Sequence, residues 1–339
     1  MTKTITQLLA DTTSSHNTDL QAKQWLKAII DTAQKEMHFL QVAQQFTLQP
    51  GWKDLAVPIR SDFISSWQSS ASEGAAVNYT TMDTLSTITF TPSDANYGIA
   101  ISNRALRISN INLITAARDE LTYRYKDVID QAIQAAILGA TDADSDTKGA
   151  QSLAGGDASG YGDTTTDVEA GDIITTDMVA RARRMLMSTS CYYWSGGSMS
   201  KSSASKAPWV PTPAEPFVLI IAPEQQEAFL KDPQFINAAE YGAREPILNG
   251  EIGSYLGVKI VVSNNLPAKS SSDSGWNTNG HVCFMVKAKR CAGIAWGQKP
   301  RIQIVDYPSE LEKRIILEMA YQAKALHADA IVKLKVADA

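Results

Sequence analysis

The chain has 339 residues, 44% hydrophobic and 20% charged, a composition typical of a soluble globular protein with two or so domains. The net charge of −5 and the pI of about 5.5 disfavour a protein that grips nucleic acid, because such proteins usually carry a basic face. The opening MTKTITQLLADTTSS lacks the features of a secretory signal, and no stretch approaches the ~20 apolar residues that span a bilayer. We therefore expect a chain without membrane contact, used in a cytoplasm or in something assembled there.

Residues 1–46 are expected to form an N-terminal arm with helical parts, because apolar residues there recur at spacings of three and four. From residue 47 to 102 apolar residues alternate instead, as in Leu55, Val57 and Ile59, which predicts strands with one buried face. The intervening WQSSASEGAAVNYTTMD is too rich in small and polar residues to bury much of itself. The pattern predicts a long antiparallel hairpin with an exposed end, and Pro58 indicates an edge strand.

The strongest helix signal covers residues 107–139, where apolar side chains fall on one stripe. The residues expected to pack along this stripe are Ile111, Ile114, Leu121, Tyr125 and Val128. Ser109 or Asn110 can cap the start, and Gly139 suits the end. A rod of about 42 Å is long for a globular domain, so we expect a sheet or another subunit to cover its stripe.

The second half of the chain predicts mixed α and β structure with two insertions. Residues 140–173 are rich in Gly, Asp, Thr and Ser and predict a polar surface loop, and residues 191–213 predict a second surface stretch. A helix follows the first insertion, with Met178, Ala182 and Leu186 on one stripe. PFVLIIAP, GVKIVVSNNLP, RIQIVDY and AIVKLKV predict strands.

No motif carries recognisable catalytic or metal chemistry. Asp142, Asp144 and Asp146 resemble the opening of a calcium loop, but Thr147 and Leu153 stand where that loop needs glycine and glutamate. The 4 histidines are not at metal-ligand spacings, and no nucleophile elbow is present. We therefore expect no enzyme activity, no cofactor and no metal.

The cysteines and tryptophans suggest packing and interface roles. Cys191, Cys283 and Cys291 are expected to be small apolar fillers, because an odd and sparse set does not form a disulfide framework. Trp52 and Trp67 are candidate interface anchors, since tryptophan dominates protein–protein hot spots. Loop-anchoring packing is the alternative for both.

The most specific segment of the chain is YGAREPILNGEIGSYLGVKIVVSNNLP, residues 241–267. Its glycines allow tight turns and a close approach to a sheet, and the valines and isoleucine after them alternate as in a strand. Alone it predicts only a turn–strand unit. The segment also resembles the axial-domain motif of tailed-phage major capsid proteins with the Hong Kong 97-type fold. The residues that carry this resemblance are Gly250, Ile252, Gly253, Gly257, Val258, Ile260, Ser263, Leu266 and Pro267.

The resemblance extends to the order of elements and implies an α+β capsid fold, nearest to the variant typified by the coat protein of coliphage N-four. The implied domains are an N-terminal arm (1–46), an extended hairpin loop (47–102), a peripheral domain (103–190) with its spine helix at 107–139 and an insertion at 140–173, an axial domain (191–300), and strands returning to the peripheral domain (301–339). The resemblance implies a shell subunit that assembles with itself into hexamers and pentamers in the virion. It also implies scaffold, portal and decoration partners, and double-stranded DNA that is enclosed without sequence-specific binding.

Two other interpretations stay open from the sequence. An encapsulin-type compartment uses the same fold, with a cargo enzyme as its partner. A soluble α+β enzyme or carbohydrate-binding module is the alternative outside the shell proteins, and the low histidine count and the missing motifs speak against it.

Overall fold

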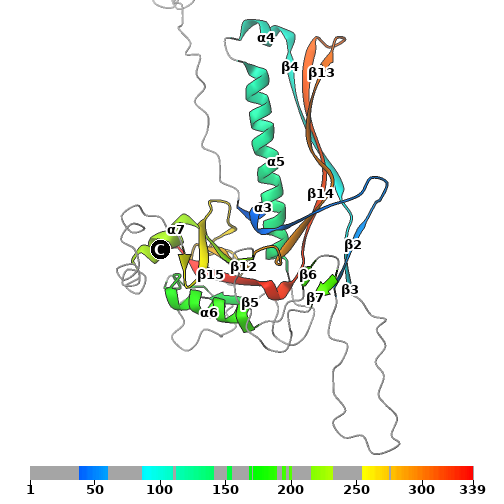
Figure 1. The fold of residues 1–339 in the computed structure, drawn as a ribbon. Coiled ribbons are helices and arrows are strands. Elements are labelled where there is room, and N and C mark those ends of the chain that lie inside the picture. The colour runs from blue at the N-terminus through cyan, green and yellow to red at the C-terminus, as the bar shows by residue number, and fades with distance from the viewer. Residues whose placement is uncertain are drawn as a thin grey trace, which may run out of the picture.

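The computed structural model describes residues 38–59, 86–109, 112–140, 151–154, 168–169, 171–188, 193–195, 198–200, 215–231, 254–274 and 276–338. Within these residues a rod built from one long helix and a narrow sheet stands on a second, broader sheet (Figure 1). The remaining strands form two separate two-stranded sheets: β2 (Leu55–Ile59) with β3 (Ser86–Phe90), and β6 (Tyr193–Ser195) with β7 (Ser198–Ser200).

The narrow sheet has four strands in the order β1-β13-β14-β4. Strands β13 (Ala292–Tyr307) and β14 (Glu312–Ala325) form a long antiparallel hairpin, β4 (Ser93–Ser102) pairs antiparallel with β14, and β1 (Gln44–Thr47) pairs parallel with the base of β13. The alternation of Ile99 and Ile101 against Ile315 and Leu317 places apolar side chains on the face toward the long helix.

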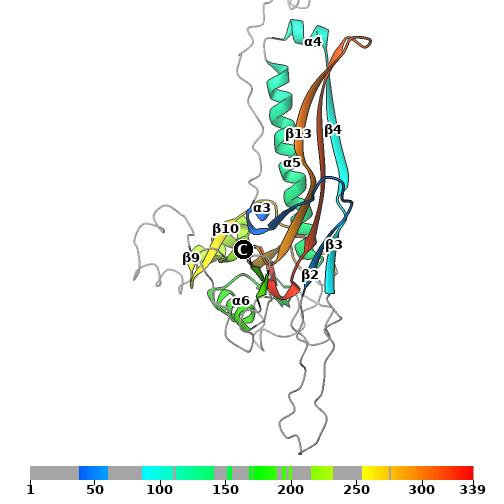
Figure 2. The same cartoon turned by 45° about the vertical axis from the view of Figure 1, so that its right-hand side comes forward.

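The long helix is α5 (Leu113–Leu138), and it runs beside the narrow sheet (Figure 2). The predicted single helix at 107–139 is wrong at its start, because a separate helix, α4 (Asn103–Ile108), precedes it. The cap is Asn112, whose side chain accepts from Thr115 N at 3.3 Å, whereas Ser109 ends α4. Such short polar side chains compete for backbone groups and break a helix. Gly139 ends the helix as expected.

The broader sheet has seven strands, with β5-β15-β12-β8-β10-β9 in order and β11 beside β12. The bounds are β5 Gln151–Ala154, β8 Phe217–Ile221, β9 Ser254–Tyr255, β10 Val258–Val262, β11 Ala268–Lys269, β12 Gly280–Lys287 and β15 Ile331–Ala337. Every residue of β8 is buried, which explains its unbroken apolar sequence. The remaining helices are α3 (Phe39–Val42), α6 (Thr176–Ser188), α7 (Pro223–Lys231) and the 3₁₀ turn η1 (Ala328–Ala330).

The hydrophobic core has two parts that share α5. The lower half of the helix contributes Ile129, Ile133 and Ile137 to the large core of the broader sheet. The upper half contributes Ala117 and Leu121 to a smaller core against the narrow sheet. One helix therefore ties the two sheets together.

Two expected boundaries need correction. Residue 300 falls inside β13, which runs unbroken from Ala292 to Tyr307. Residues 301–339 do not all return to one sheet, because β15 pairs with β12 in the broader sheet. The alternating, mostly apolar β15 is largely buried, as a strand inside a covered sheet must be.

The insertion at 140–173 is not wholly a surface loop. Strand β5 pairs parallel with β15, and both Val168 and Asp172 are buried. Asn277 N donates to Val168 O at 2.9 Å, and Ala337 N donates to Asp172 O at 2.9 Å. The expected hairpin has its base in β2 and β3, with Pro58 opposite Thr87 in a two-stranded ribbon. Its tip and the arm over 1–37 lie outside the described residues.

Candidate functional site: the Asp130 cluster and the surfaces it holds

The packing residues expected on the long helix divide between its two faces. Leu121 is buried, and Ile114 and Tyr125 are partly buried against the narrow sheet. Val128 is 41% exposed, so within one subunit its expected packing role is wrong, and its neighbour Ile129 is buried instead. The buried side rotates because the helix leaves the narrow sheet and enters the main core. Ile111 lies outside the described residues.

A buried cluster of polar groups joins the helix to two other segments of the chain. Asp130 is buried on α5 and accepts hydrogen bonds from Phe39 N at 2.8 Å, Leu40 N at 3.3 Å and Asn265 Nδ2 at 3.2 Å. The Asn265 amide also lies 3.5 Å from Asp127 Oδ1. We call these five residues the Asp130 cluster. It holds the start of α3 and the turn after β10 against one point of the helix.

Burial raises the pKa of the Asp130 carboxyl above its ordinary value, because the charged form loses its water. The Asn265 side chain and the amides of Phe39 and Leu40 act in the opposite direction, as does the nearby His38. A carboxylate that accepts these hydrogen bonds fixes the positions of α3 and of the Asn265 turn relative to α5, because hydrogen bonds require short distances and near-linear angles.

The Asn265 turn belongs to the glycine-rich motif that the sequence singled out. Gln134 Nε2 on α5 donates to Asn265 O, and Asn265 N donates to Ser263 Oγ at 3.2 Å. Ser263 N donates to Ile221 O at 2.8 Å, and Pro267 O accepts from Val282 N at 3.1 Å. The end of the motif is thus fastened to β8, β12 and α5.

The start of the motif's strand is a tight hairpin between β9 and β10. Leu256 and Gly257 are its two central residues and both have positive φ, 51° and 75°, as a type I′ turn requires. Val258 and Ile260 then enter the core, while Leu256 is 46% exposed. Gly250, Ile252 and Gly253 lie outside the described residues.

Replacing Leu256 with asparagine should raise the free energy of unfolding of the isolated subunit by about 1 kcal/mol, because a left-handed conformation strains leucine and suits asparagine. Urea unfolding of the purified subunit measures the change. Gly257→Ala is the matched control and should destabilise, since it introduces a Cβ at positive φ. A lower unfolding midpoint for Leu256→Asn would contradict the strain argument.

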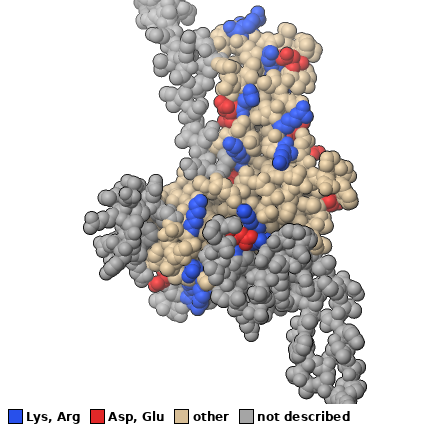
Figure 3. Space-filling view, in the orientation of Figure 1, with Lys and Arg blue, Asp and Glu red and all other residues tan. Residues whose placement is uncertain are grey.

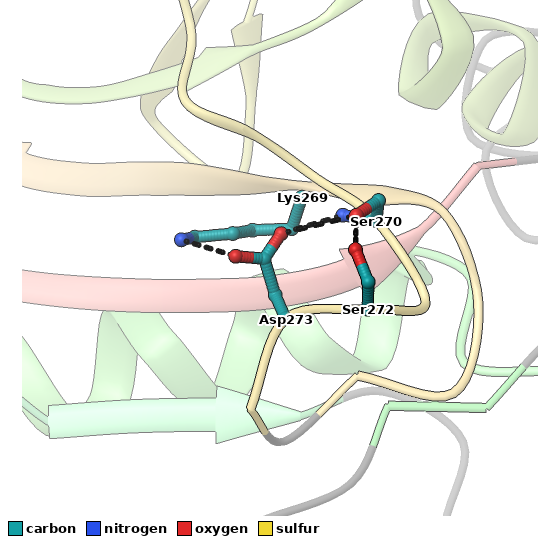
Figure 4. Close-up of polar contacts among 4 residues, drawn as sticks. All are labelled: Lys269, Ser270, Ser272 and Asp273. Carbon is teal, nitrogen blue, oxygen red and sulfur yellow. Dashed lines mark hydrogen bonds and ion pairs between the residues drawn. The ribbon is translucent and has the colours of Figure 1, made fainter.

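The loop between β11 and β12 is closed by one carboxylate (Figure 4). Asp273 Oδ2 accepts from Ser270 N at 2.9 Å, and Asp273 Oδ1 lies 3.4 Å from Lys269 Nζ. Ser270 Oγ and Ser272 Oγ lie 2.7 Å apart. The hydrogen bond from Ser270 N is the main cause that lowers the pKa of Asp273, and the charge of Lys269 acts in the same direction, against a smaller opposing effect of desolvation. The loop leads directly into Trp276, whose ring is buried.

The exposed surface carries mixed charge and scattered large apolar side chains. Figure 3 shows Lys and Arg spread along the rod with Asp and Glu among them. Trp52, a candidate interface anchor, is 69% exposed between β1 and β2, and Trp67 lies outside the described residues. Cys283 and Cys291 are buried as expected, and burial raises the pKa of each thiol to about 12. Cys191 is not among the described residues.

The described part of the chain contains no group of three or more His, Cys, Asp and Glu that could hold a metal ion. Its helices are also all too short or too polar to cross a membrane.

The sequence patterns did not predict the Asp130 cluster, although Asp130 is one of two acidic residues on the buried side of α5. Asp127 and Asp130 are both buried among Ile129 and Ile133. A charged residue at helical spacing between buried isoleucines was the available signal, since buried acids need partners. The partners themselves lie 90 and more residues away in the chain.

The arrangement of rod and sheet defines the fold, which is that of solved capsid structures of phages and of a GTA particle. The capsid protein of cyanophage P-SCSP1u matches with a TM-score of 0.65 at 16% identity, over 95% of this chain and 94% of that chain. That of cyanophage Pam1 matches with a TM-score of 0.65 at 14% identity, over 94% and 98%. The capsid of a native GTA particle matches with a TM-score of 0.64 at 15% identity, over 96% and 98%. At these identities the likeness establishes the fold alone.

The sequence itself establishes the family. The model of a family described as phage capsid protein matches residues 86–334, and no curated protein matches the chain. Because this match covers most of the chain, the chain belongs to that phage capsid protein family. It is a capsid protein, a structural subunit of the shell of the virion, and the expected α+β capsid fold is confirmed. The encapsulin alternative gains no support from these matches.

Proposed function

We propose that copies of this chain close into hexamers and pentamers, and that these form the icosahedral shell of a tailed phage around its double-stranded DNA. The observation that carries the proposal is the family match from residue 86 to residue 334. The mixed charge along the rod and the net charge of −5 suit a wall that confines DNA without reading its sequence.

Each part of the fold receives a role in this proposal. The rod of α5 with the narrow sheet acts as the peripheral domain, and the broader sheet with the glycine-rich motif acts as the axial domain near the centre of each capsomer. The β2–β3 hairpin and the arm before Phe39 reach neighbouring copies, with Trp52 as a contact. Trp52 is exposed in the single subunit, so a neighbouring copy could bury it. This supports the role, because tryptophans buried at interfaces carry much of the binding energy.

The proposal also covers partners, place of assembly and chemistry. Scaffold, portal and decoration proteins are the expected partners, and the shell assembles in the host cytoplasm before it becomes part of the virion. The chain acts by assembly and not by catalysis. Interfaces between copies should exceed the ~2,000 Å² that marks permanent complexes.

The test is electron microscopy of the purified chain, combined with mass from light scattering. Closed shells, tubes or rings of five or six subunits support the proposal. A chain that stays monomeric even when scaffold or phage lysate is added would refute it. Nucleic acid or enzyme cargo recovered with the shells separates a phage shell from a cellular compartment.

A further inference from the structure

The two edges of the narrow sheet differ in how they are protected. An exposed edge strand presents unpaired N–H and C=O groups and can pair with another chain, so proteins usually protect it with charges, proline or bulges. One edge of this sheet is formed by the short strand β1 and, beyond it, by the rest of β13, and the other edge is β4. Figure 2 shows β4 running along the rod at the sheet's margin. Within the described residues β4 pairs with β14 alone.

The β13 edge carries most of the known protective devices. Strand β1 covers β13 from Gly293 to Trp296. The pairing of β13 with β14 shifts register twice between Trp296 and Arg301. Lys299, Pro300 and Arg301 follow one another in the same stretch. These features bend the strand, remove a donor and add charge, so the edge resists an added strand.

The β4 edge has almost none of these devices. Its ten residues, SDANYGIAIS, contain no lysine, arginine or proline, and Asp94 is their only charged residue. They pair with β14 without a register shift from Ser93 to Ser102. At about 3.3 Å per residue the open edge is about 33 Å long. An edge so long, regular and uncharged is a pairing site unless something covers it.

The side chains of β4 also suit a covering strand. Tyr97 is 66% exposed although its ladder partner Leu317 is buried, so a strand beside β4 would bury the ring. On the other face Gly98 and Ala100 are small and exposed, which lets a neighbouring backbone approach closely.

We propose that the outer edge of β4 is an assembly surface that accepts an extended segment of a second copy of this chain as an added strand. The proposal rests on the shell function and deepens it. A second copy is the occupant because the shell is built from copies of this chain. The near absence of charge on the edge disfavours a polyelectrolyte such as DNA. Contacts of this head-to-tail kind join one surface to a different surface of the next copy, and they form a ring where the rotation between copies closes.

The first test is hydrogen exchange of the wild-type chain, measured in the free subunit and in the assembled shell. Amides of β4 that point outward should exchange at least about tenfold more slowly in the shell, because strand addition gives them partners. Amides of β13 from Gln298 to Tyr307 should not gain this protection. Equal exchange of β4 in both states would overturn the proposal. Protection that appears only when another phage protein is added to finished shells would also overturn it.

The second test compares one substitution at two edges. Ala100 and Val305 both pair with Arg314, from opposite sides of β14, so they lie at the same height and on the same face. Ala100→Lys adds charge to the β4 edge and should reduce the yield of shells at least about tenfold, whereas Val305→Lys should leave the yield near that of the wild type. Shells formed equally by both variants would overturn the proposal. A wild-type chain that never assembles would overturn the shell function as well, which is a separate and recognisable result.

Discussion

Replacing Asp130 with alanine is expected to lower the free energy of unfolding by about 3 kcal/mol, because buried donors that lose a charged acceptor carry the full penalty of desolvation. The amides of Phe39 and Leu40 and the side chain of Asn265 all donate to this carboxylate. Without it, α3 and the turn after β10 lose their common attachment to α5. We expect the loss to be felt most at α3, a helix of only four residues.

Urea unfolding measures the stability, and hydrogen exchange at Phe39 and Leu40 measures the release of α3. Asp119→Ala is the matched control, since Asp119 is an exposed acid on the same helix. It should change stability by no more than about 0.5 kcal/mol. Equal stability of the two variants, with unchanged exchange at Phe39 and Leu40, would show that the Asp130 cluster does not hold the segments together.

The pH dependence of this effect has a definite sign. Burial raises the pKa of Asp130 in the folded chain, so the folded chain binds this proton more tightly than the unfolded chain does. The stability contributed by Asp130 therefore increases as pH falls through its folded pKa. Compared with Asp130→Asn, the wild type should gain stability as the pH falls from neutral toward the ordinary carboxyl pKa of 3.8. A relative loss over that range would mean that the pKa is lowered and that the donors outweigh burial.

The sequence predicted those parts of the fold whose signals are local. Alternation identified the strands, and Gly139 marked the end of the long helix. The break before that helix was missed because apolar spacing continues across it, while the cap is decided by which of several polar side chains reaches an amide, here Asn112. The pairing of β15 with β12 was not predicted. The alternating sequence of β15 shows that one face of the strand is more buried than the other, but it does not show to which sheet the strand belongs.

The Asp130 cluster lies beyond local patterns for a physical reason. Its hydrogen bonds join residues 90, 91 and 135 positions apart, and no spacing rule connects such positions. Resemblance located the motif that ends at Pro267, but the attachment of that motif to α5 through Asn265 came only from the three-dimensional structure. The tight packing around Gly280 was also visible only in the three-dimensional structure, because nothing in the sequence distinguishes this glycine from the others.

Substituting alanine for Gly280 is expected to destabilise the fold by about 3 kcal/mol, at the upper end for overpacking in a core. Gly280 opens β12 and pairs with Ala337 of β15. A Cβ at this position would overlap the carbonyl oxygen of Val336 and come within 2.6 Å of Trp276 Cζ3 and 3.1 Å of Ala337 Cα. Two of these three atoms are backbone of the paired strand, so they cannot withdraw without opening the ladder.

Gly98→Ala is the matched control for this substitution, because Gly98 also lies in a strand and its Cβ would meet atoms only at 3.7 and 3.8 Å. Alanine there should be neutral or stabilise by about 0.5 kcal/mol, since it restricts the unfolded chain. Urea unfolding of both variants measures the difference. Equal midpoints would mean that β15 and the Trp276 ring can shift at little cost. A large difference would identify the contact of Trp276 with the start of β12 as a rigid point of the broader sheet, which the closed loop around Asp273 leads into.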